Sequence, residues 1–454
     1  MSQSTVDVLS KTRVSLQLPT TTPPPPPTKL SLFDAVWIGL PPVQRLFLYR
    51  NIDHVPFSTI AGFLKSSLSS TLPHFLPLAG KLAYVPSTGD VDIDFSDPGF
   101  AFLEAESDID LRPLIEDQVH DTEAFRKLVP LLHAAELPFW PFSVQVTGFK
   151  CGGVAIGYSV HHAVADGIAI WQFVTAWTGN CKAEMNSKPQ PRYRLPTFDR
   201  ELIKHPRAEE IARNFLRTAA PDLPICPQAP GINEGRHQLA RRTFVLDAPT
   251  IRSLKQRAMQ QQQQQHSNAN DGSRRPPPSS FLALAAHLWT SFVRAKSLKP
   301  EESSVFVLLA DCRARLDPRL PEGYFGNCVR GVHADAPASA LAAEDGLSRA
   351  RAKLGGSIAE ALEDPLGDVD RWLGDFAGVP FERLSSVAGS PRFKAYEADF
   401  GFGRPDRVEL VSMNRDGEVA LVGGKDEGTV QVTVALNRNQ MDAYAEAFLS
   451  GLSD

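Results

Sequence analysis

Residues 154–177 read VAIGYSVHHAVADGIAIWQFVTAW, and this stretch is the most informative part of the chain. Apolar side chains occupy every second position over residues 154–160, which predicts a β-strand. Over residues 170–177 the apolar side chains recur at helical spacing instead. The segment HHAVADG, residues 161–167, therefore lies at a junction between strand and helix, where side chains can face a cleft rather than a core.

Two histidines and an aspartate occupy this junction. Asp166 is suited to be the N-cap of the helix, because its carboxylate can accept hydrogen bonds from free backbone N–H groups. A histidine at a strand end is more often an ordinary polar residue, and no third or fourth metal ligand follows at close spacing. A neutral imidazole can, however, remove the proton of an attacking hydroxyl, which typically accelerates a reaction by about 10² to 10⁴. We expect His162 to be such a general base, with Asp166 supporting the turn that aims its ring.

The rest of the chain mixes helix and strand patterns without an internal repeat, which predicts an α/β fold. Strands are expected at residues 12–18, 81–85, 91–95, 419–422 and 429–436, and helices at 57–72, 207–217, from 279 onward and at 441–452. Asp90, Asp92 and Asp94 alternate with apolar residues in one hairpin. We expect them on a solvated strand face rather than at a metal site.

Three stretches have the composition of loops or linkers. Prolines 23–27 predict a stiff surface spacer. Residues 186–240 are rich in proline and charge and are expected to cross over between two domains. Residues 260–278 contain a glutamine run and a proline triplet, which predicts a disordered loop.

The overall composition limits the classes of protein. A chain of 454 residues suits two domains, and a net charge of −5 argues against nucleic-acid binding. The five scattered cysteines form no CxxC pair, so a zinc site or a secreted disulfide framework is not expected. No signal core or membrane span is evident. A cytoplasmic protein without membrane contact fits these features.

Several motifs resemble those of one enzyme family, the plant BAHD acyltransferases, which use acyl-CoA donors. Residues 162–167 resemble its HxxxD motif, which chloramphenicol acetyltransferase-like enzymes and peptide-synthetase condensation domains also carry. Residues 399–403, DFGFG, look like its DFGWG motif, and residues 324–328, YFGNC, are similar to a motif of the flavonoid and anthocyanin branch. Further stretches that resemble that branch are residues 30–49, 76–82 and 390–396. The resemblance covers essentially the whole chain.

The resemblance implies two chloramphenicol-acetyltransferase-like α/β domains, residues 1–185 and 241–454, joined by the crossover at 186–240. A solvent channel would pass between them and place His162 midway. His162 would deprotonate a hydroxyl, which attacks the thioester of acyl-CoA directly, without an acyl-enzyme. By the same resemblance Asp166 points away from the substrate and pairs with an arginine, for which Arg313 and Arg315 are the candidates.

The second motif departs from the family pattern at Phe402, where the family usually has tryptophan. In the family this motif shapes the fold near the CoA side without taking part in the chemistry. Asp399, Gly401 and Gly403 would then be structural, because glycine allows backbone conformations that other residues resist. The missing indole N–H removes one hydrogen-bond donor.

Cations should line the mouth of the channel that receives the phosphates of CoA. The candidates are Arg252, Lys255, Arg392, Lys394 and Arg404, of which Arg392 and Lys394 lie beside the second motif. A malonyl donor needs a cation for its free carboxylate, whereas a hydroxycinnamoyl donor needs an apolar slot. Many relatives that use malonyl-CoA carry a basic residue where this chain has Ile168, which weakens the case for a malonyl donor. Arg392 would then be the substitute partner of the malonyl carboxylate. Both donors stay open.

The acceptor implied by the resemblance is a hydroxyl of a flavonoid, anthocyanin or other phenolic glycoside. Acyl-CoA would be a co-substrate, with no permanently bound cofactor or metal, and the protein a monomer. Two alternatives remain: acylation of another plant alcohol or amine, and a non-catalytic binding protein on the same scaffold. Turnover with a panel of acyl-CoAs discriminates between them.

Overall fold

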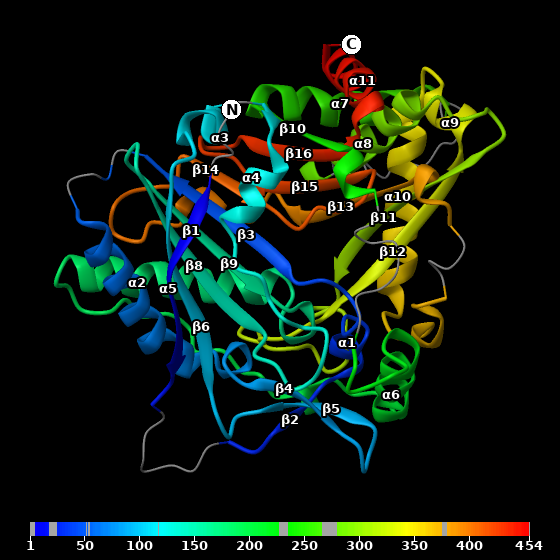
Figure 1. Cartoon of the computed structure of the whole chain (residues 1–454). Helices are drawn as coiled ribbons and strands as arrows, with labels where there is room; N and C mark the ends of the chain where they lie inside the picture. Colours follow the sequence, from blue (N-terminus) through cyan, green and yellow to red (C-terminus); the bar gives the residue numbers. More distant parts are fainter. Residues whose placement is uncertain are drawn as a thin grey trace.

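The computed structural model describes residues 5–17, 25–50, 52, 55–116, 118–226, 235–265, 279–374 and 379–453. Two large mixed sheets and one small sheet are surrounded by helices (Figure 1). The α/β class predicted from the alternating patterns is therefore confirmed.

The first large sheet has six strands in the order β1-β6-β8-β9-β3-β14. The strands are β1 (Val6–Ser15), β3 (Val43–Tyr49), β6 (Gly99–Ser107), β8 (Phe142–Phe149), β9 (Val154–Val160) and β14 (Arg407–Leu410). Strands β6 and β8 run parallel, and the other neighbours are antiparallel. Strand β9, which leads into the two histidines, is buried along its whole length in the middle of this sheet.

The second large sheet has seven strands in the order β12-β11-β13-β15-β16-β10-β7. These are β7 (Val119–His120), β10 (Leu239–Leu246), β11 (Ser303–Asp311), β12 (Val329–Pro337), β13 (Leu384–Ser390), β15 (Glu418–Gly423) and β16 (Val430–Asn437). The small sheet has the order β2-β5-β4, formed by β2 (Thr28–Lys29), β4 (Lys81–Val85) and β5 (Asp90–Asp94).

The helices bury apolar faces against these sheets. They are α1 (Leu32–Ala35), α2 (Phe57–Thr71), α3 (Leu111–Glu116), α4 (Thr122–Lys127), α5 (Gly167–Met185), α6 (Ala208–Ala219), α7 (Ala248–Gln265), α8 (Ser280–Lys296), α9 (Ala338–Ala342), α10 (Gly346–Glu363) and α11 (Met441–Ser453). Leu64 of α2 and Trp177 of α5 share one core with the first sheet. Leu288 of α8 and Phe448 of α11 share another core with the second sheet.

Each large sheet includes a strand from the other half of the chain. Strand β14 follows the DFGFG segment and pairs with β3 in the first sheet, whereas β7 pairs with β10 in the second. The two exchanged strands meet where Arg407 Nη2 lies 2.7 Å from His120 Nε2. The sheets are thus interlocked, and a division into domains at residues 185 and 241 stays a proposal.

Most expected elements are found near their predicted positions, including the hairpin of β4 and β5 and the helices α2, α8 and α11. The first strand begins earlier than predicted, at Val6, and ends at Ser15, because its pairing with β6 sets its limits. The loop predicted at 260–278 is wrong for residues 260–265, which continue helix α7, and the remainder lies outside the described residues. Within the proline run at 23–27, residues 25–27 belong to no strand, and residues 23 and 24 lie outside the described part of the chain.

The prediction of a solvated face for the hairpin aspartates is wrong for Asp90. Its exposed fraction is 3%. Helix α6 of the crossover supplies Arg213, whose Nε donates to Asp90 Oδ1 at 2.8 Å, and Lys29 Nζ lies 3.2 Å from Oδ2. Two segments distant in sequence, α6 and β2, therefore provide the cations that allow this carboxylate to be buried.

Candidate active site

The two histidines that follow β9 lie in different environments. His161 is 1% exposed, and its Nδ1 accepts a hydrogen bond from the Ala163 N–H at 3.3 Å, which caps a short 3-10 helix, His162–Val164. Burial lowers the pKa of His161 to about 3, followed by a smaller effect of His162, so its ring is neutral at pH 7. His162 is partly exposed. His161 is consequently a structural cap, and His162 is the histidine available for chemistry.

Asn327 determines which nitrogen of His162 carries the proton. Its Nδ2 donates to the carbonyl oxygen of His162 and to Asp34 Oδ1, both at 2.8 Å. Because both partners are acceptors, the amide oxygen must face the imidazole, where Oδ1 lies 3.1 Å from Nδ1 of His162. An amide oxygen only accepts, so Nδ1 is the protonated nitrogen and Nε2 keeps its lone pair. This is the tautomer that a general base needs.

The face of the imidazole is covered by an aromatic ring. Trp37 stacks on His162 with ring centroids 3.9 Å apart and an interplanar angle of 17°. Burial lowers the pKa of His162, while the charges of Asp166 and Asp34 act in the opposite direction. The ring is thus fixed in orientation by Trp37 and Asn327 and held in its neutral form by burial.

Asp166 contacts the backbone and Arg313 rather than the imidazole. It is the N-cap of α5, and its Oδ1 accepts from the Ala169 N–H at 3.1 Å. Arg313 Nη1 lies 2.8 Å from Oδ2, and the Cys328 N–H donates to Oδ2 at 3.0 Å. The structure therefore places Arg313, and not Arg315, against the aspartate. The Asp166 carboxylate joins α5, the turn after β11 and the YFGNC segment.

The YFGNC segment, residues 324–328, contacts both His162 and Asp166. The ring of Tyr324 lies 5.7 Å from the guanidinium carbons of Arg200 and Arg313. Carbonyl oxygens of Phe325 and Gly326 accept from Arg200 and Arg313 respectively. Since the next two residues, Asn327 and Cys328, bind His162 and Asp166, the whole segment holds the turn that carries these two residues.

The DFGFG segment is held by its own aspartate. Asp399 Oδ1 accepts from the N–H groups of Gly401 at 2.8 Å and Gly403 at 2.9 Å. Both glycines have positive φ, 115° and 106°, which other residues rarely adopt. Phe402 packs on Tyr49 with ring centroids 4.8 Å apart. These contacts fit a structural role for the segment.

Four of the five candidate CoA cations line one cavity of about 610 Å³. They are Arg252, Lys255, Lys394 and Arg404, and Lys425 joins them there. The N-terminal residue of helix α8, Ser280, also lines the cavity, and a helix N-terminus favours anions. Arg392 is exposed and follows Pro391 of this lining. Its neighbour Phe393 lies against Gly167, so the loop extends from the cavity to the start of α5.

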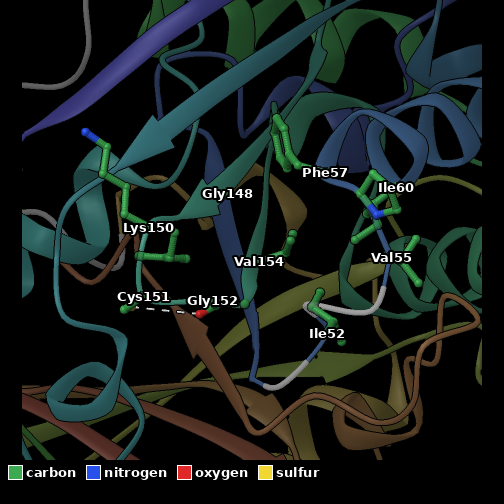
Figure 2. Close-up of a pocket in the computed structure, with 12 residues that line it drawn as sticks. Ile52, Val55, Phe57, Ile60, Gly148, Lys150, Cys151, Gly152 and Val154 are labelled. Carbon is green, nitrogen blue, oxygen red and sulfur yellow. Dashed lines mark hydrogen bonds between the residues drawn. The ribbon is translucent and has the colours of Figure 1, made fainter.

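A second cavity, of about 410 Å³, lies elsewhere, at the start of α2 and the turn after β8 (Figure 2). Figure 2 shows Ile52, Phe57 and Ile60 on one side and Lys150 and Cys151 on the other. None of the predicted site residues lines it. Among the described residues, no group of three His, Cys, Asp or Glu side chains could hold a metal ion.

A sequence model described as the transferase family matches residues 4–450. The chain belongs to the BAHD acyltransferases. The family resemblance drawn from the motifs is confirmed, and so is the expectation of an acyltransferase. No helix in the described part of this BAHD enzyme is long and apolar enough to cross a membrane.

Two BAHD relatives and one solved structure illustrate the similarity. The chain is 31% identical over 438 residues to phenolic glucoside malonyltransferase 2 of Arabidopsis thaliana, with 93% of each covered. It is 31% identical over 463 residues to a malonyl-coenzyme:anthocyanin 5-O-glucoside-6'''-O-malonyltransferase of Salvia splendens, covering 93% of this chain and 91% of the relative. Vinorine synthase matches with a TM-score of 0.73 at 21% identity over 98% of each chain. The predicted chloramphenicol-acetyltransferase-like fold is thereby confirmed.

The sequence motifs indicate His162, Asp166 and Arg313, but they assign no role to the residues that orient the imidazole. Trp37 and Asp34 lie in the stretch 30–49, and Asn327 lies in the YFGNC motif. Both stretches resemble motifs of the family, and a polar residue inside such a motif is the signal that could have indicated them. Arg200, in the crossover, carried no signal of its own.

Proposed function

We propose that this BAHD enzyme transfers a malonyl group from malonyl-CoA to a sugar hydroxyl of a phenolic or anthocyanin glucoside. Relatives that share 31% identity over nearly their whole length are named for this reaction. The single observation that carries the chemistry is the contact of Asn327 with Nδ1 of His162, which leaves Nε2 as a base.

In the proposed mechanism, the hydroxyl oxygen attacks the thioester carbonyl while Nε2 of His162 accepts its proton. The tetrahedral intermediate then collapses, the C–S bond breaks, and the imidazolium returns the proton to the leaving thiolate of CoA. No acyl-enzyme forms, and no further reactant is consumed. Asp166 supports the turn through Arg313 and touches neither substrate. The solvent channel between the two sheets remains part of this proposal.

The cavity of about 610 Å³ is the proposed site for the phosphates of CoA. Lys255 and Arg404 lie on α7 and on the loop after DFGFG, so cations approach the cavity from different segments. Replacing either with glutamine should raise the KM for malonyl-CoA about 3- to 10-fold, the effect expected from losing one charge pair at a partly exposed site. Malonyl-pantetheine, which lacks the phosphates, should show no such change. Lys353→Gln on α10, outside the cavity, is the matched control.

Arg392 is the proposed partner of the malonyl carboxylate. Its exposed side chain precedes Phe393, whose ring approaches the start of α5 beside Ile168. Arg392→Gln should raise the KM for malonyl-CoA and leave the KM for acetyl-CoA, which has no free carboxylate, unchanged. An equal rise with both donors would assign Arg392 to the CoA moiety instead.

The test of the proposed function is a donor and acceptor panel. Malonyl-, acetyl- and p-coumaroyl-CoA are each combined with a phenolic glucoside, an anthocyanin glucoside, the matching aglycones and an amine, and products are identified by mass. We expect malonylated glucosides, and none with the aglycones. Preferential p-coumaroyl transfer would contradict malonyl-CoA as the donor, and acylation of the amine would contradict a glucoside as the acceptor. Binding of donor without release of CoA would identify a non-catalytic protein.

We further propose a cytoplasmic monomer. Free thiols at all five cysteines fit a reducing compartment. Gel filtration with light scattering and localisation of a tagged protein test the two statements.

A further inference from the structure

Arg200 is a buried arginine of the crossover segment that lies beside the catalytic turn. Its exposed fraction is 7%. Thr197 forms a parallel bridge with Tyr324, and the Phe325 N–H donates to the carbonyl oxygen of Thr197 at 2.7 Å. This short pairing brings Arg200 against the YFGNC segment.

The guanidinium of Arg200 binds three segments around His162. Nε donates to Asp34 Oδ2 at 2.9 Å, on helix α1. Nη2 donates to the carbonyl oxygen of Val164 at 3.2 Å, at the end of the catalytic 3-10 helix. Nη1 donates to the carbonyl oxygen of Phe325, two residues before Asn327. Such a planar fork can hold several acceptors at once in fixed positions.

Gly326 leaves room for this fork. A Cβ atom at Gly326 would lie 2.6 Å from the guanidinium carbon of Arg200. The glycine of the YFGNC motif thus accommodates a side chain from a segment more than a hundred residues away in the sequence.

Asp34 connects Arg200 to the base. Its carboxylate also accepts from the N–H of Ser31 at 3.1 Å, from Ser31 Oγ at 2.7 Å, and from the N–H and Nδ2 of Asn327 at 3.1 and 2.8 Å. Asn327 in turn sets the tautomer of His162. A continuous set of hydrogen bonds therefore runs from Arg200 through Asp34 and Asn327 to the imidazole.

We propose that Arg200 is a positioning residue for the reaction, which holds Asp34 and Asn327 so that His162 presents Nε2 to the acceptor. The inference rests on the proposed role of His162 as general base. Arg200 touches no substrate in this proposal, and its effect passes through Asp34.

The proposal predicts a specific change in kinetics for Arg200→Met. The kcat should fall about 10- to 100-fold, as expected for a misplaced catalytic group. The KM for malonyl-CoA should change little, because the CoA cavity is lined by other residues. Arg200→Lys keeps the charge but not the fork, so its kcat should lie between those of wild type and Arg200→Met.

The pH profile provides a readout that simple loss of packing would not move. The charged or titratable groups around His162 are Asp34, Asp166 and His161, together with the guanidinium groups of Arg200 and Arg313, which pair with the two aspartates. In Arg200→Met the charge of Asp34 is no longer balanced and favours the imidazolium, so the acid limb of kcat/KM should move to higher pH. In Asp34→Asn that charge is absent, so the limb should move to lower pH. Arg200→Lys should keep the wild-type limb.

Arg330→Met is the matched control. Arg330 is 6% exposed in its side chain, and its guanidinium binds Asp368 and two carbonyl oxygens rather than His162, Asp34 or Asn327. It should lose stability without a shift of the acid limb. Wild-type kcat and an unshifted limb in a folded Arg200→Met would overturn the proposal. If that variant does not fold, an unshifted limb in Asp34→Asn overturns it instead. A wild-type protein without turnover would overturn the proposed function itself.

Discussion

Lys182 Nζ lies 2.6 Å from Asp399 Oδ2, which joins the C-terminal part of helix α5 to the DFGFG segment. The same helix begins directly after Asp166, its N-cap. Helix α5 therefore connects the two motifs, although more than two hundred residues separate them in the sequence. A disturbance of DFGFG can reach the catalytic turn through this helix.

Asp399→Ala should lower the free energy of unfolding by about 1–3 kcal/mol, because the N–H groups of Gly401 and Gly403 lose their acceptor. Lys182→Met should cost less than about 1 kcal/mol, since the lysine is 55% exposed and its ion pair is screened by solvent. Urea unfolding of the two variants measures the difference. Equal losses would mean that the ion pair, rather than the backbone contacts, holds the segment.

Asp166→Asn should be strongly destabilising, by about 3–5 kcal/mol, because it leaves the buried guanidinium of Arg313 without its closest carboxylate. The double variant Asp166→Asn/Arg313→Met should recover part of this loss, since no uncompensated charge is then buried. Thermal and urea unfolding report both effects. A double variant less stable than Asp166→Asn alone would contradict the assignment of Asp166 as a partner of Arg313.

Phe402→Trp should be tolerated, with a change in stability below about 1.5 kcal/mol. The ring is partly exposed and packs on Tyr49, so the larger indole has room at the solvent side. The KM for malonyl-CoA should stay the same, because the segment is held by Asp399. A clearly lower KM would show that an indole N–H at this position helps to hold the donor.

The acid limb of kcat/KM should lie below the ordinary histidine pKa of about 6.5, since burial lowers the pKa of His162. A base acts only when unprotonated, so activity should fall about tenfold per pH unit below that lowered pKa. The free energy of unfolding should also fall as the pH is lowered. Burial lowers the pKa of His120 to about 4, so folding keeps this ring neutral, and the protein loses stability as the pH falls from about 6.5 towards 4. Unfolding must therefore be measured at each pH of the kinetic assay. An acid limb above pH 7 would contradict the lowered pKa of His162.

The fold class, most elements and the turn that carries His162 and Asp166 were predictable because their signals are local or belong to motifs. The strand-to-helix junction around His162 and the N-cap at Asp166 need only their neighbours in the chain. The contacts of Asn327 with His162 and of Arg200 with Asp34 span 165 and 166 residues, and spacing carries no information about such pairs. Asp90 shows the same limit, because its cation comes from a helix 123 residues away.

The most direct measurement is CoA release from malonyl-CoA and a phenolic glucoside by wild type, His162→Ala and His161→Ala, with unfolding curves confirming that each variant folds. His162→Ala should lose turnover by about 10² to 10⁴ or more, the contribution of a general base. His161→Ala removes a buried cap from the same turn and should only weaken turnover. Wild-type turnover by His162→Ala would contradict the role of His162 as the general base, and so would equal losses in the two folded variants.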